Sequence, residues 1–407
     1  MKVRTSFTID DKIFFDVKHQ DFIRTVNSQT MPFLFPDESK WQKAIDIGTE
    51  VRRKKVPKYF ILIGMGGSRF AVEALYQASL KNQTRLICAD SLDSEDLDST
   101  LGKLPENIKK EDIVFYIVSK SGNTLETLLI ADFVLDHFYK RSCVNKDNVF
   151  VATEDDSKLH EFAKKMNFRH IPMDKNVGGR FSIFSPWVAF AGAVLGIDMV
   201  EFKESADHAI TDLTSKRDSS VFDYSDLFIE SFNQFGVHDI WTEADYLTPL
   251  AKWYEQLFAE SLGKTIDDGI SFSLLPNVRN ITRDLHSVMQ MYSGAKIKRP
   301  VLWLSAKEEN TSANLSSTAV NFVFRKELSL TDVKKALVGS IKQEYMNLSL
   351  APIFAESDKI SSPIDIAKFV IWAMLSVSYI GWSLGIDTYT QPDVESYKKV
   401  AKNKLGI

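Results

Sequence analysis

The chain has 407 residues, of which 44% are hydrophobic and 26% charged, as in an ordinary soluble globular protein. This length exceeds one typical hydrophobic core, so two domains are expected. The formal net charge is −4, from 50 Lys and Arg against 54 Asp and Glu, and there is no basic tail, so nucleic-acid binding is disfavoured.

Cysteine usage and apolar segments indicate the compartment. Cys88 and Cys143 stand in no CxxC or metal-binding spacing, which suggests a reducing environment, and the N-terminus lacks a signal-peptide core. Residues 369–386 contain no charged side chain and reach the lower length limit of a membrane span. Their serines and glycines favour the alternative, a helix buried between domains or subunits. We therefore expect a cytoplasmic protein with no membrane partner.

Strands alternate with helices in the first half of the chain. Residues 59–77 have the pattern of a strand, a glycine turn and a helix. Further predicted elements are strands at 85–89, 113–118 and 148–153 and helices from Thr124 and from Ser157. This alternation predicts a parallel, doubly wound sheet, in which ligands bind beyond the carboxyl ends of the strands. We expect an N-terminal segment at 1–44 and a first domain at 45–200.

A charged helical stretch at 201–216 leads into a second alternation. Its predicted elements are strands near 240, 273 and 303 and helices at 248–264, from about 283, at 332–350 and at 364–384. We expect a second domain at 201–386, then a C-terminal helix within 387–407 whose Pro392 suits the first turn. The predicted fold class is α/β, with two doubly wound, mainly parallel sheets and flanking helices.

The turn at 119–124 joins a buried strand to a helix. Its hydroxyls, the strand end and the helix N-terminus make an anion pocket for which phosphate is the natural ligand, with Thr124 as the N-cap. The alternative is an ordinary capped turn. The candidate residues are Ser119, Lys120, Ser121 and Thr124.

Two glycine-containing turns are further candidates. The turn at 64–68, Gly-Met-Gly-Gly-Ser, only partly matches the dinucleotide fingerprint, because the third glycine and the acidic residue are missing. Close approach of a ligand's polar groups is the better interpretation. At 177–182, Arg180 beside two glycines is suited to stabilise negative charge in a phosphate or enolate site. The alternative is a solvated arginine in a surface loop.

The predicted helix at 248–264 is amphipathic. Its apolar face consists of Leu250, Trp253, Tyr254, Leu257 and Phe258. Gln256 and Glu260 stack on one flank of that face, where a carboxylate can be partly desolvated, as suits a general base. The alternative is a surface glutamate on an amphipathic helix.

His286 and Lys398 complete the candidates. His286 lies at the start of a helix, where a lone histidine usually only packs, and Lys398 begins a lysine run that is otherwise solvated. No histidine–carboxylate cluster with metal spacing is apparent, so we expect metal-free chemistry.

These segments together resemble the phosphoglucose isomerase family. Their motifs occur in the family's order from residue 63 to residue 398 and leave the first forty residues uncovered. The motifs are IGMGGS at 63–68, SKSGNTLET at 119–127, VGGRFS at 177–182, YEQLFAESLGK at 254–264, DLHSVMQ at 284–290 and QPDVESYK at 391–398.

The resemblance implies sugar-isomerase-type domains and a cofactor-free isomerisation of glucose 6-phosphate to fructose 6-phosphate, a step of glycolysis and gluconeogenesis. It makes Glu260 the base that moves a proton between sugar carbons 1 and 2, and Arg180 the cation beside the enediolate. It assigns ring opening to His286 and Lys398, and implies a homodimer in which the histidine reaches the neighbouring subunit's site. The substrate-binding residues that it implies are Gly67, Ser68, Ser119, Lys120, Ser121, Thr124, Gln256 and Gln391.

The chain departs from the family pattern at two places. The SKSGNT turn has fewer threonines than many members, and Asp393 replaces a glycine common after Gln-Pro, adding a negative charge near Gln391 and Lys398. Two other functions stay open: an isomerase that also accepts mannose 6-phosphate, and a non-enzymatic sugar-phosphate sensor. A sensor would bring a basic helix-turn-helix segment, and none is found, so the isomerase is favoured.

Overall fold

The computed structural model describes residues 2–5, 16–79, 82–266, 269–307, 323–324, 328–351 and 353–406. It divides into two compact units, each assembled from separate stretches of the sequence. Unit 1 comprises Met1–Phe15, Lys216–Ser361 and Leu375–Thr388, and unit 2 comprises Asp16–Ser215, Ser362–Met374 and Tyr389–Ile407. Each unit contains one five-stranded sheet.

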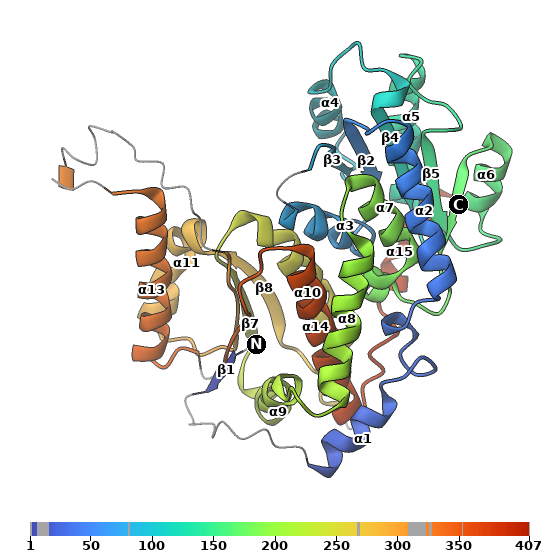
Figure 1. The fold of residues 1–407 in the computed structure, drawn as a ribbon. Helices are drawn as coiled ribbons and strands as arrows, with labels where there is room; N and C mark the ends of the chain where they lie inside the picture. Colours follow the sequence, from blue (N-terminus) through green and yellow to red (C-terminus); the bar gives the residue numbers. More distant parts are fainter. Residues whose placement is uncertain are drawn as a thin grey trace. The chain divides into compact units, whose positions relative to one another are not determined.

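The sheet of unit 2 is parallel throughout, in the order β3-β2-β4-β5-β6 (Figure 1). Its strands are β2 (Tyr59–Ile63), β3 (Arg85–Ala89), β4 (Ile113–Val118), β5 (Val149–Thr153) and β6 (Arg169–Pro172). The α-helices of unit 2 are α1 (Val17–Thr25), α2 (Glu38–Lys54), α3 (Gly67–Ala78), α4 (Ser94–Gly102), α5 (Leu125–Tyr139), α6 (Lys158–Met166), α7 (Pro186–Leu195), α8 (Met199–Thr214) and α15 (Val394–Leu405). Its short 3-10 helices are η1 (Pro32–Leu34), η2 (Lys110–Asp112) and η3 (Gly179–Phe184).

Helices cover both faces of this sheet, which is why every residue of β4 is buried. On one face, Phe115 packs edge-on against Phe138 of α5, in an apolar core that α4 and α6 also join. On the other face, Tyr116 contacts Phe190 of α7 and donates a 2.9 Å hydrogen bond to the Trp187 carbonyl. The sheet is therefore doubly wound.

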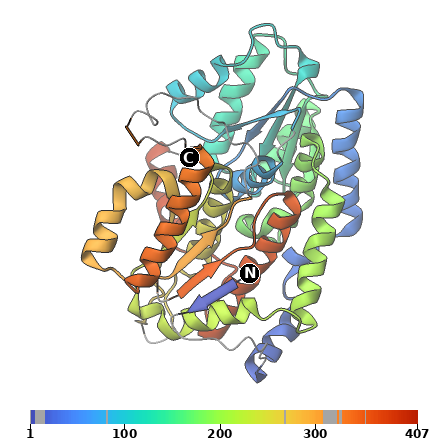
Figure 2. The same cartoon turned by 60° about the vertical axis from the view of Figure 1, so that its left-hand side comes forward.

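The sheet of unit 1 has the order β1-β10-β9-β7-β8, and only the β1–β10 pair is antiparallel. Figure 2 shows β1, in blue beside the N label, at the edge of this sheet. The strands are β1 (Lys2–Thr5), β7 (Val237–Thr242), β8 (Leu275–Asn280), β9 (Val301–Leu304) and β10 (Ile353–Glu356). The helices are α9 (Ser220–Ser231), η4 (Phe232–Gln234), η5 (Asp245–Leu247), α10 (Thr248–Leu262), α11 (Ile281–Ala295) and α13 (Leu330–Asn347).

This second sheet is covered on both faces as well. Trp241 of β7 stacks on Trp303 of β9 and, with Tyr345 of α13, belongs to an apolar cluster that α11 joins. On the opposite face, the His238 ring contacts Phe228 of α9 and the aromatic side chains of α10. Figure 1 accordingly shows α11 and α13 on one side of β7 and β8 and α10 on the other. The predicted α/β class with two doubly wound, mainly parallel sheets and a C-terminal helix is confirmed.

Helix α14 (Pro363–Leu384) is the described helix that is long and apolar enough to cross a membrane. Of its most apolar stretch of 18 residues, 83% is buried. Within unit 1, Tyr379 donates a 2.9 Å hydrogen bond to Asp226, and the Ser376 carbonyl accepts one from Ser225. These contacts are those of a core helix of a folded protein.

Two sequence predictions differ from the structure. The prediction of a strand near 273 is wrong, because the strand in this region is β8 (Leu275–Asn280), at the edge of the sheet. Its Pro276 and Asn277 are not typical strand residues, and the strand conformation comes from pairing with β7. Pro392 is wrong as a first-turn residue, because it precedes Asp393, the N-cap of α15. The expected domain ranges stay a prediction, and the two compact units divide the chain differently: residue 200 lies inside α8, and residues 16–44 belong to unit 2, where Trp41 and Ala44 of α2 are buried.

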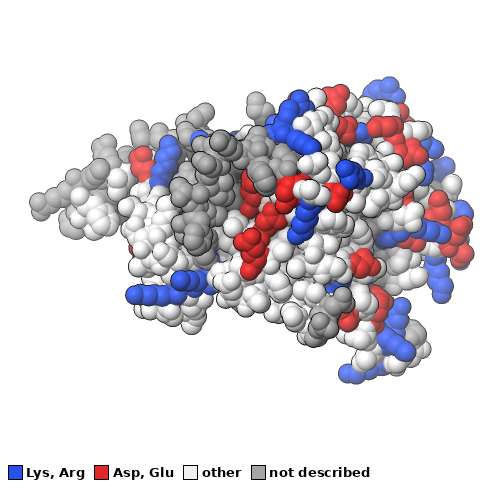
Figure 3. Space-filling model, turned by 90° about the horizontal axis from the view of Figure 1, so that it is seen from below, with Lys and Arg blue, Asp and Glu red and all other residues white. Residues whose placement is uncertain are grey.

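Charged side chains of both signs share the surface in Figure 3. On the face drawn there, Lys and Arg are interspersed with Asp and Glu. A face of this kind differs from the single-sign basic surface that follows a nucleic-acid backbone.

Candidate active site

The hydroxyl turn at 119–124 is built at the carboxyl end of β4. Ser119 is buried, and its backbone amide donates a 3.0 Å hydrogen bond to the Ala152 carbonyl, which holds the start of the turn against β5. Gly122 adopts a positive φ of 65°, and a Cβ there would lie 2.6 Å from the Ser157 hydroxyl oxygen. Glycine is therefore required where the turn packs against the start of α6.

The turn ends at the N-terminus of α5, with Thr124 at the N-cap as predicted. The Thr124 side chain does not cap the helix; its Oγ1 accepts a 3.1 Å hydrogen bond from the Ser119 hydroxyl. The first-turn amides have no partner within their own helix and carry the positive end of its dipole. Donor-rich backbone and adjacent hydroxyls make this an anion-binding geometry.

Lys120 fixes the turn instead of extending into solvent. Its Nζ donates to the Lys175 carbonyl at 2.8 Å and lies 3.6 Å from a Glu154 carboxylate oxygen. The Lys120 carbonyl accepts from the Glu154 amide at 2.9 Å and from the Thr153 hydroxyl at 3.2 Å. The role of Lys120 visible in unit 2 is to hold the hydroxyl turn against the end of β5.

The two glycine-containing turns meet in unit 2. A Cβ on Gly64 would lie 3.1 Å from the carbonyl oxygen of Val118, where β4 ends, so the turn after β2 adjoins the hydroxyl turn. A Cβ on Gly67 would lie 2.7 Å from the Gly179 carbonyl oxygen. Only a residue without a side chain permits this contact, which brings Gly67 and Ser68 beside Arg180.

Arg180 is buried, with 1% of its surface exposed, in contrast to the alternative of a solvated arginine. Its Nη1 donates to the Gln391 side-chain oxygen, and its Nη2 donates to the Thr390 carbonyl at 3.0 Å. The neighbouring Phe181 packs against Tyr389 with ring centroids 5.5 Å apart. The family-like segments at 177–182 and 391–398 are thus joined, although the sequence separates them widely.

Lys398 lies on α15, beyond the segment that binds Arg180. Its Nζ pairs with Glu395 one turn earlier at 2.8 Å, and its side chain is 43% exposed. Asp393 sits at the N-cap of the same helix without capping it through its side chain. Among the described residues, no hydrogen bond or ion pair links Asp393 to Gln391 or Lys398.

Gln256 and Glu260 form the polar flank of α10 that the helical spacing predicts. Gln256 Nε2 donates to Glu260 Oε1 at 2.9 Å, and both residues are half-buried. The apolar face is buried in unit 1 as predicted, with Trp253 and Tyr254 completely enclosed. The amide of Gln256 therefore orients the carboxylate of Glu260, and Gln256 Oε1 has no hydrogen-bond partner among the described residues.

His286 lies on the solvent side of α11. Leu285, Val288 and Met289 of this helix pack toward the unit 1 core, whereas His286 is exposed. Among the described residues, its ring makes no hydrogen bond or ion pair. Gln256, Glu260 and His286 belong to unit 1, and the other predicted site residues belong to unit 2.

Sequence reasoning missed one cluster with chemical potential. Asp155, His160 and His170 converge in unit 2, although their spacing matches no common metal motif. The sequence analysis searched for metal-binding spacing, which these three residues lack, so their convergence is visible only in the folded chain. Thr390 was also missed, because a backbone carbonyl that binds Arg180 leaves no signal in the sequence.

A family model described as phosphoglucose isomerase matches residues 42–279, more than half of the chain. The chain belongs to the phosphoglucose isomerase family. The matched range contains Glu260 and the three turns of unit 2, whereas His286, Gln391 and Lys398 lie beyond it.

Curated relatives agree with membership of the phosphoglucose isomerase family, and a solved structure agrees with the fold. The chain is 27% identical over 368 residues to glucose-6-phosphate isomerase of Campylobacter jejuni, covering 88% of this chain and 87% of the relative. It is 26% identical to glucose-6-phosphate isomerase of Mycoplasmoides gallisepticum, covering 96% of this chain and 93% of that relative. The fold matches a crystal structure of glucose-6-phosphate isomerase from Chlamydia trachomatis with a TM-score of 0.74 at 17% identity, covering 99% of this chain and 80% of that one.

Proposed function

We propose that this chain is a glucose-6-phosphate isomerase, which interconverts glucose 6-phosphate and fructose 6-phosphate in the cytoplasm. The observation that carries the proposal is the family match of a chain whose hydroxyl turn ends at a helix N-terminus. Ser119, Ser121 and Thr124 would bind the phosphate with the first-turn amides of α5, while Lys120 keeps the turn in place. Gly67, Ser68, Gln256 and Gln391 would line the sugar.

Glu260 is the proposed base of the proton transfer. An aldose–ketose isomerisation removes the proton from carbon 2 and returns it to carbon 1, so one carboxylate can act as base and then as acid. The hydrogen bond from Gln256 Nε2 to Glu260 Oε1 orients this carboxylate on the polar flank of α10. A proton shuttle of this kind requires no redox cofactor.

Arg180 is the proposed electrophile. The cis-enediolate formed after proton removal carries negative charge on adjacent oxygens, which a fixed guanidinium stabilises. The hydrogen bonds of Arg180 to Gln391 and Thr390 hold that guanidinium before the reaction, so little reorganisation is needed.

His286 and Lys398 are proposed to open the sugar ring by proton transfer to and from its oxygens. The exposure of His286 on α11 supports a homodimer in which this histidine serves the partner subunit's site. Lys398 would act from α15, where its ion pair with Glu395 is exposed and easily exchanged.

The proposal is tested with the purified full chain and fructose 6-phosphate. Glucose 6-phosphate formation is followed by coupling to an NADP-dependent glucose-6-phosphate dehydrogenase. We expect turnover that disappears in an equally purified Glu260→Gln variant, which excludes an isomerase carried over from the expression host. Mannose 6-phosphate in the same assay tests the broader isomerase activity. Binding of 6-phosphogluconate without any turnover would overturn the proposal in favour of a sensor.

A further inference from the structure

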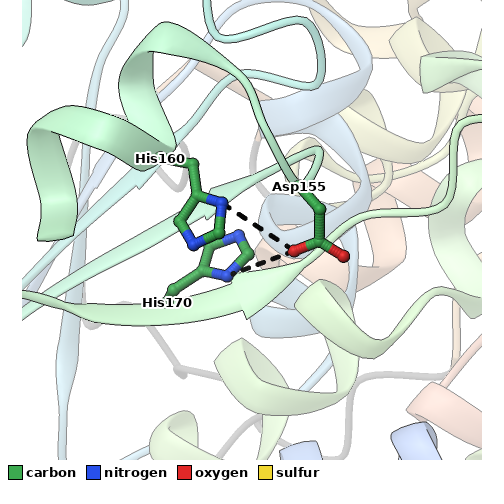
Figure 4. Close-up of side chains that lie close together, drawn as sticks. All are labelled: Asp155, His160 and His170. Atoms are coloured by element: carbon green, nitrogen blue, oxygen red, sulfur yellow. Dashed lines mark ion pairs between the residues drawn. The ribbon is translucent and has the colours of Figure 1, made fainter.

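Asp155, His160 and His170 form a compact cluster at one corner of unit 2 (Figure 4). Asp155 follows the end of β5, His160 lies in the first turn of α6, and His170 belongs to β6. Three successive elements therefore each contribute one side chain with a metal-binding atom. The hydroxyl of the N-cap residue Ser157 accepts a 3.1 Å hydrogen bond from the His160 amide and so fixes where α6 begins.

The three side chains converge on one point. Asp155 Oδ1 lies 3.9 Å from His160 Nδ1 and 3.7 Å from His170 Nδ1. The side chains of His160 and His170 are 12% and 17% exposed, whereas that of Asp155 is 63% exposed. The two imidazoles stack with their centroids 3.9 Å apart and their planes inclined by 22°. Two nearly enclosed rings thus lie near one exposed carboxylate, and the dashed lines in Figure 4 join its oxygen to a nitrogen of each ring.

Hydrogen-bond partners identify which nitrogens carry lone pairs at that point. His170 Nε2 lies 3.0 Å from the Thr153 carbonyl oxygen, which can only accept, so Nε2 holds the proton and Nδ1 is unprotonated. His160 Nδ1 accepts a 3.2 Å hydrogen bond from the Asp156 amide, so its one lone pair is directed at that amide and reaches an ion only when the ring turns. In the neutral ring, Nδ1 of His170 therefore holds the lone pair.

Three side chains that can bind a metal ion therefore surround one small region, in which the Asp156 amide donates to His160 Nδ1. Neutral imidazole nitrogens and a carboxylate repel each other there unless a cation lies among them. The Thr153 carbonyl behind His170 is the kind of outer partner that sets the tautomer and orientation of metal-binding histidines. Conversely, an ordinary hydrogen-bonded turn would pair at least one imidazole N–H with Asp155.

We propose that Asp155, His160 and His170 bind a divalent transition-metal ion of the zinc class, through Asp155 Oδ1 and the two Nδ1 atoms. Two imidazoles and one carboxylate suit Zn²⁺, Co²⁺ or Ni²⁺, whereas Mg²⁺ and Ca²⁺ prefer oxygen ligands. Bonds of about 2.0–2.1 Å to a tetrahedral ion space the ligands by roughly 3.4 Å. Because the two rings are stacked and His160 Nδ1 faces the Asp156 amide, the His160 ring must turn for both Nδ1 atoms to bind one ion. The exposed Asp155 can move with it, and water completes the coordination.

The site is separate from the isomerase chemistry and does not depend on it. An ion held there would cross-link the β5–α6 turn, the start of α6 and β6. The Thr153 residue behind His170 also donates its hydroxyl hydrogen to the Lys120 carbonyl, so the cross-link adjoins the hydroxyl turn. The expected consequence of metal binding is a more stable unit 2.

The test uses the full chain with any affinity tag removed and bound metals stripped by a chelator. Zn²⁺ is titrated by calorimetry, and Co²⁺ is followed through its visible absorption, which is intense for tetrahedral sites. We expect one equivalent of either ion per chain, a higher melting temperature with Zn²⁺, and no response to Mg²⁺. Since changes in outer partners alone weaken metal binding about 10- to 100-fold, losing a ligand should cost at least tenfold.

The variants are His160→Ala, His170→Ala and Asp155→Asn, with His208→Ala as the matched control. His208 is an exposed histidine on α8, outside the cluster, so its loss should leave the affinity unchanged. Asp155 is exposed enough that Asp155→Asn tests the site even where removal of a buried histidine prevents folding. Wild-type affinity in a folded Asp155→Asn or His160→Ala variant overturns the proposal, as does a wild-type chain that binds neither Zn²⁺ nor Co²⁺.

Discussion

The buried guanidinium of Arg180 donates a hydrogen bond to the side-chain oxygen of Gln391, 211 residues further along the chain. Its second terminal nitrogen donates to the Thr390 carbonyl at 3.0 Å. A buried guanidinium is costly unless its donors are matched, so these two acceptors determine how its planar fork is held. The segment before α15 therefore prepares Arg180 for the role proposed for it.

Replacing Arg180 by lysine keeps the charge but removes the fork. We expect kcat/KM for fructose 6-phosphate to fall by about 10²–10³, mainly through kcat, because the enediolate loses preorganised donors. Gln391→Ala should cost less, since the Thr390 carbonyl still holds the guanidinium. Steady-state kinetics measure both, with Arg24→Lys as a control in an exposed ion pair with Asp21. Full activity in Arg180→Lys would remove this residue from the mechanism.

The hydroxyl turn should control substrate binding more than turnover. Ser119→Ala or Thr124→Ala should each cost about 1.5–3 kcal/mol of binding to fructose 6-phosphate and to 6-phosphogluconate, a phosphate-bearing competitor. Because the two hydroxyls share a hydrogen bond, the double variant should cost less than the sum. Inhibition constants measure this, and Thr211→Ala on α8 is the control. Unchanged inhibition in the double variant would place the phosphate elsewhere.

Glu260→Gln keeps the shape of the side chain and removes its ability to accept a proton. We expect both isomerisation and solvent-deuterium incorporation at sugar carbon 2 to collapse, because they share the same proton transfer. Mass spectrometry of the recovered sugar phosphate measures the incorporation. Exchange that continues at the wild-type rate would assign the proton transfer to another group. The control Glu255→Gln changes the carboxylate that pairs with Lys252 on the same helix.

Local signals allowed much of unit 2 to be predicted. Ile113–Val118 is apolar at every position and is followed by a hydroxyl N-cap, so both the strand and the start of α5 follow from short-range chemistry. The amphipathic face of α10 likewise follows from its helical period. The edge strand β8 could not be predicted in this way, because its sequence is polar and its conformation comes from pairing with β7.

The rest of the candidate site is formed by contacts between segments that are far apart in the sequence. The fold brings Gly67 into contact with Gly179 and lets Arg180 donate a hydrogen bond to Gln391. No rule of sequence spacing relates these positions. Family resemblance placed them in one site without showing how they touch. The cluster of Asp155, His160 and His170 had no such resemblance to point to it and became visible only once β5, α6 and β6 were assembled.

Subunit mixing tests the proposed shared site. Glu260→Gln and His286→Ala chains, each inactive alone, are unfolded together and refolded. If His286 serves the partner's site, a mixed dimer has one site with both defects and one site with neither. Random pairing makes about half of the dimers mixed, so roughly a quarter of wild-type activity should return. Native mass spectrometry confirms the exchange, and an exchanged yet inactive mixture would show that His286 serves its own subunit.

His238 predicts how the stability of the protein depends on pH. The ring is fully buried between the Tyr224 hydroxyl and the Pro300 carbonyl, each 3.2 Å from a ring nitrogen. Burial lowers the pKa of His238 from 6.5 to about 4. The unfolded chain therefore takes up this proton at a higher pH than the folded chain does. The contribution of His238 is constant above about pH 6.5 and is lost progressively as the pH falls toward 4.

Between pH 7 and pH 5, this one group should lower the free energy of unfolding by about 2 kcal/mol. Urea unfolding at both pH values measures the loss. His238→Gln should be less stable than wild type at pH 7 but should lose less stability on acidification, because it has no proton to take up. The matched control His208→Gln changes an exposed histidine and should keep the wild-type pH dependence. An equal loss in wild type and His238→Gln would mean that other groups cause the acid sensitivity.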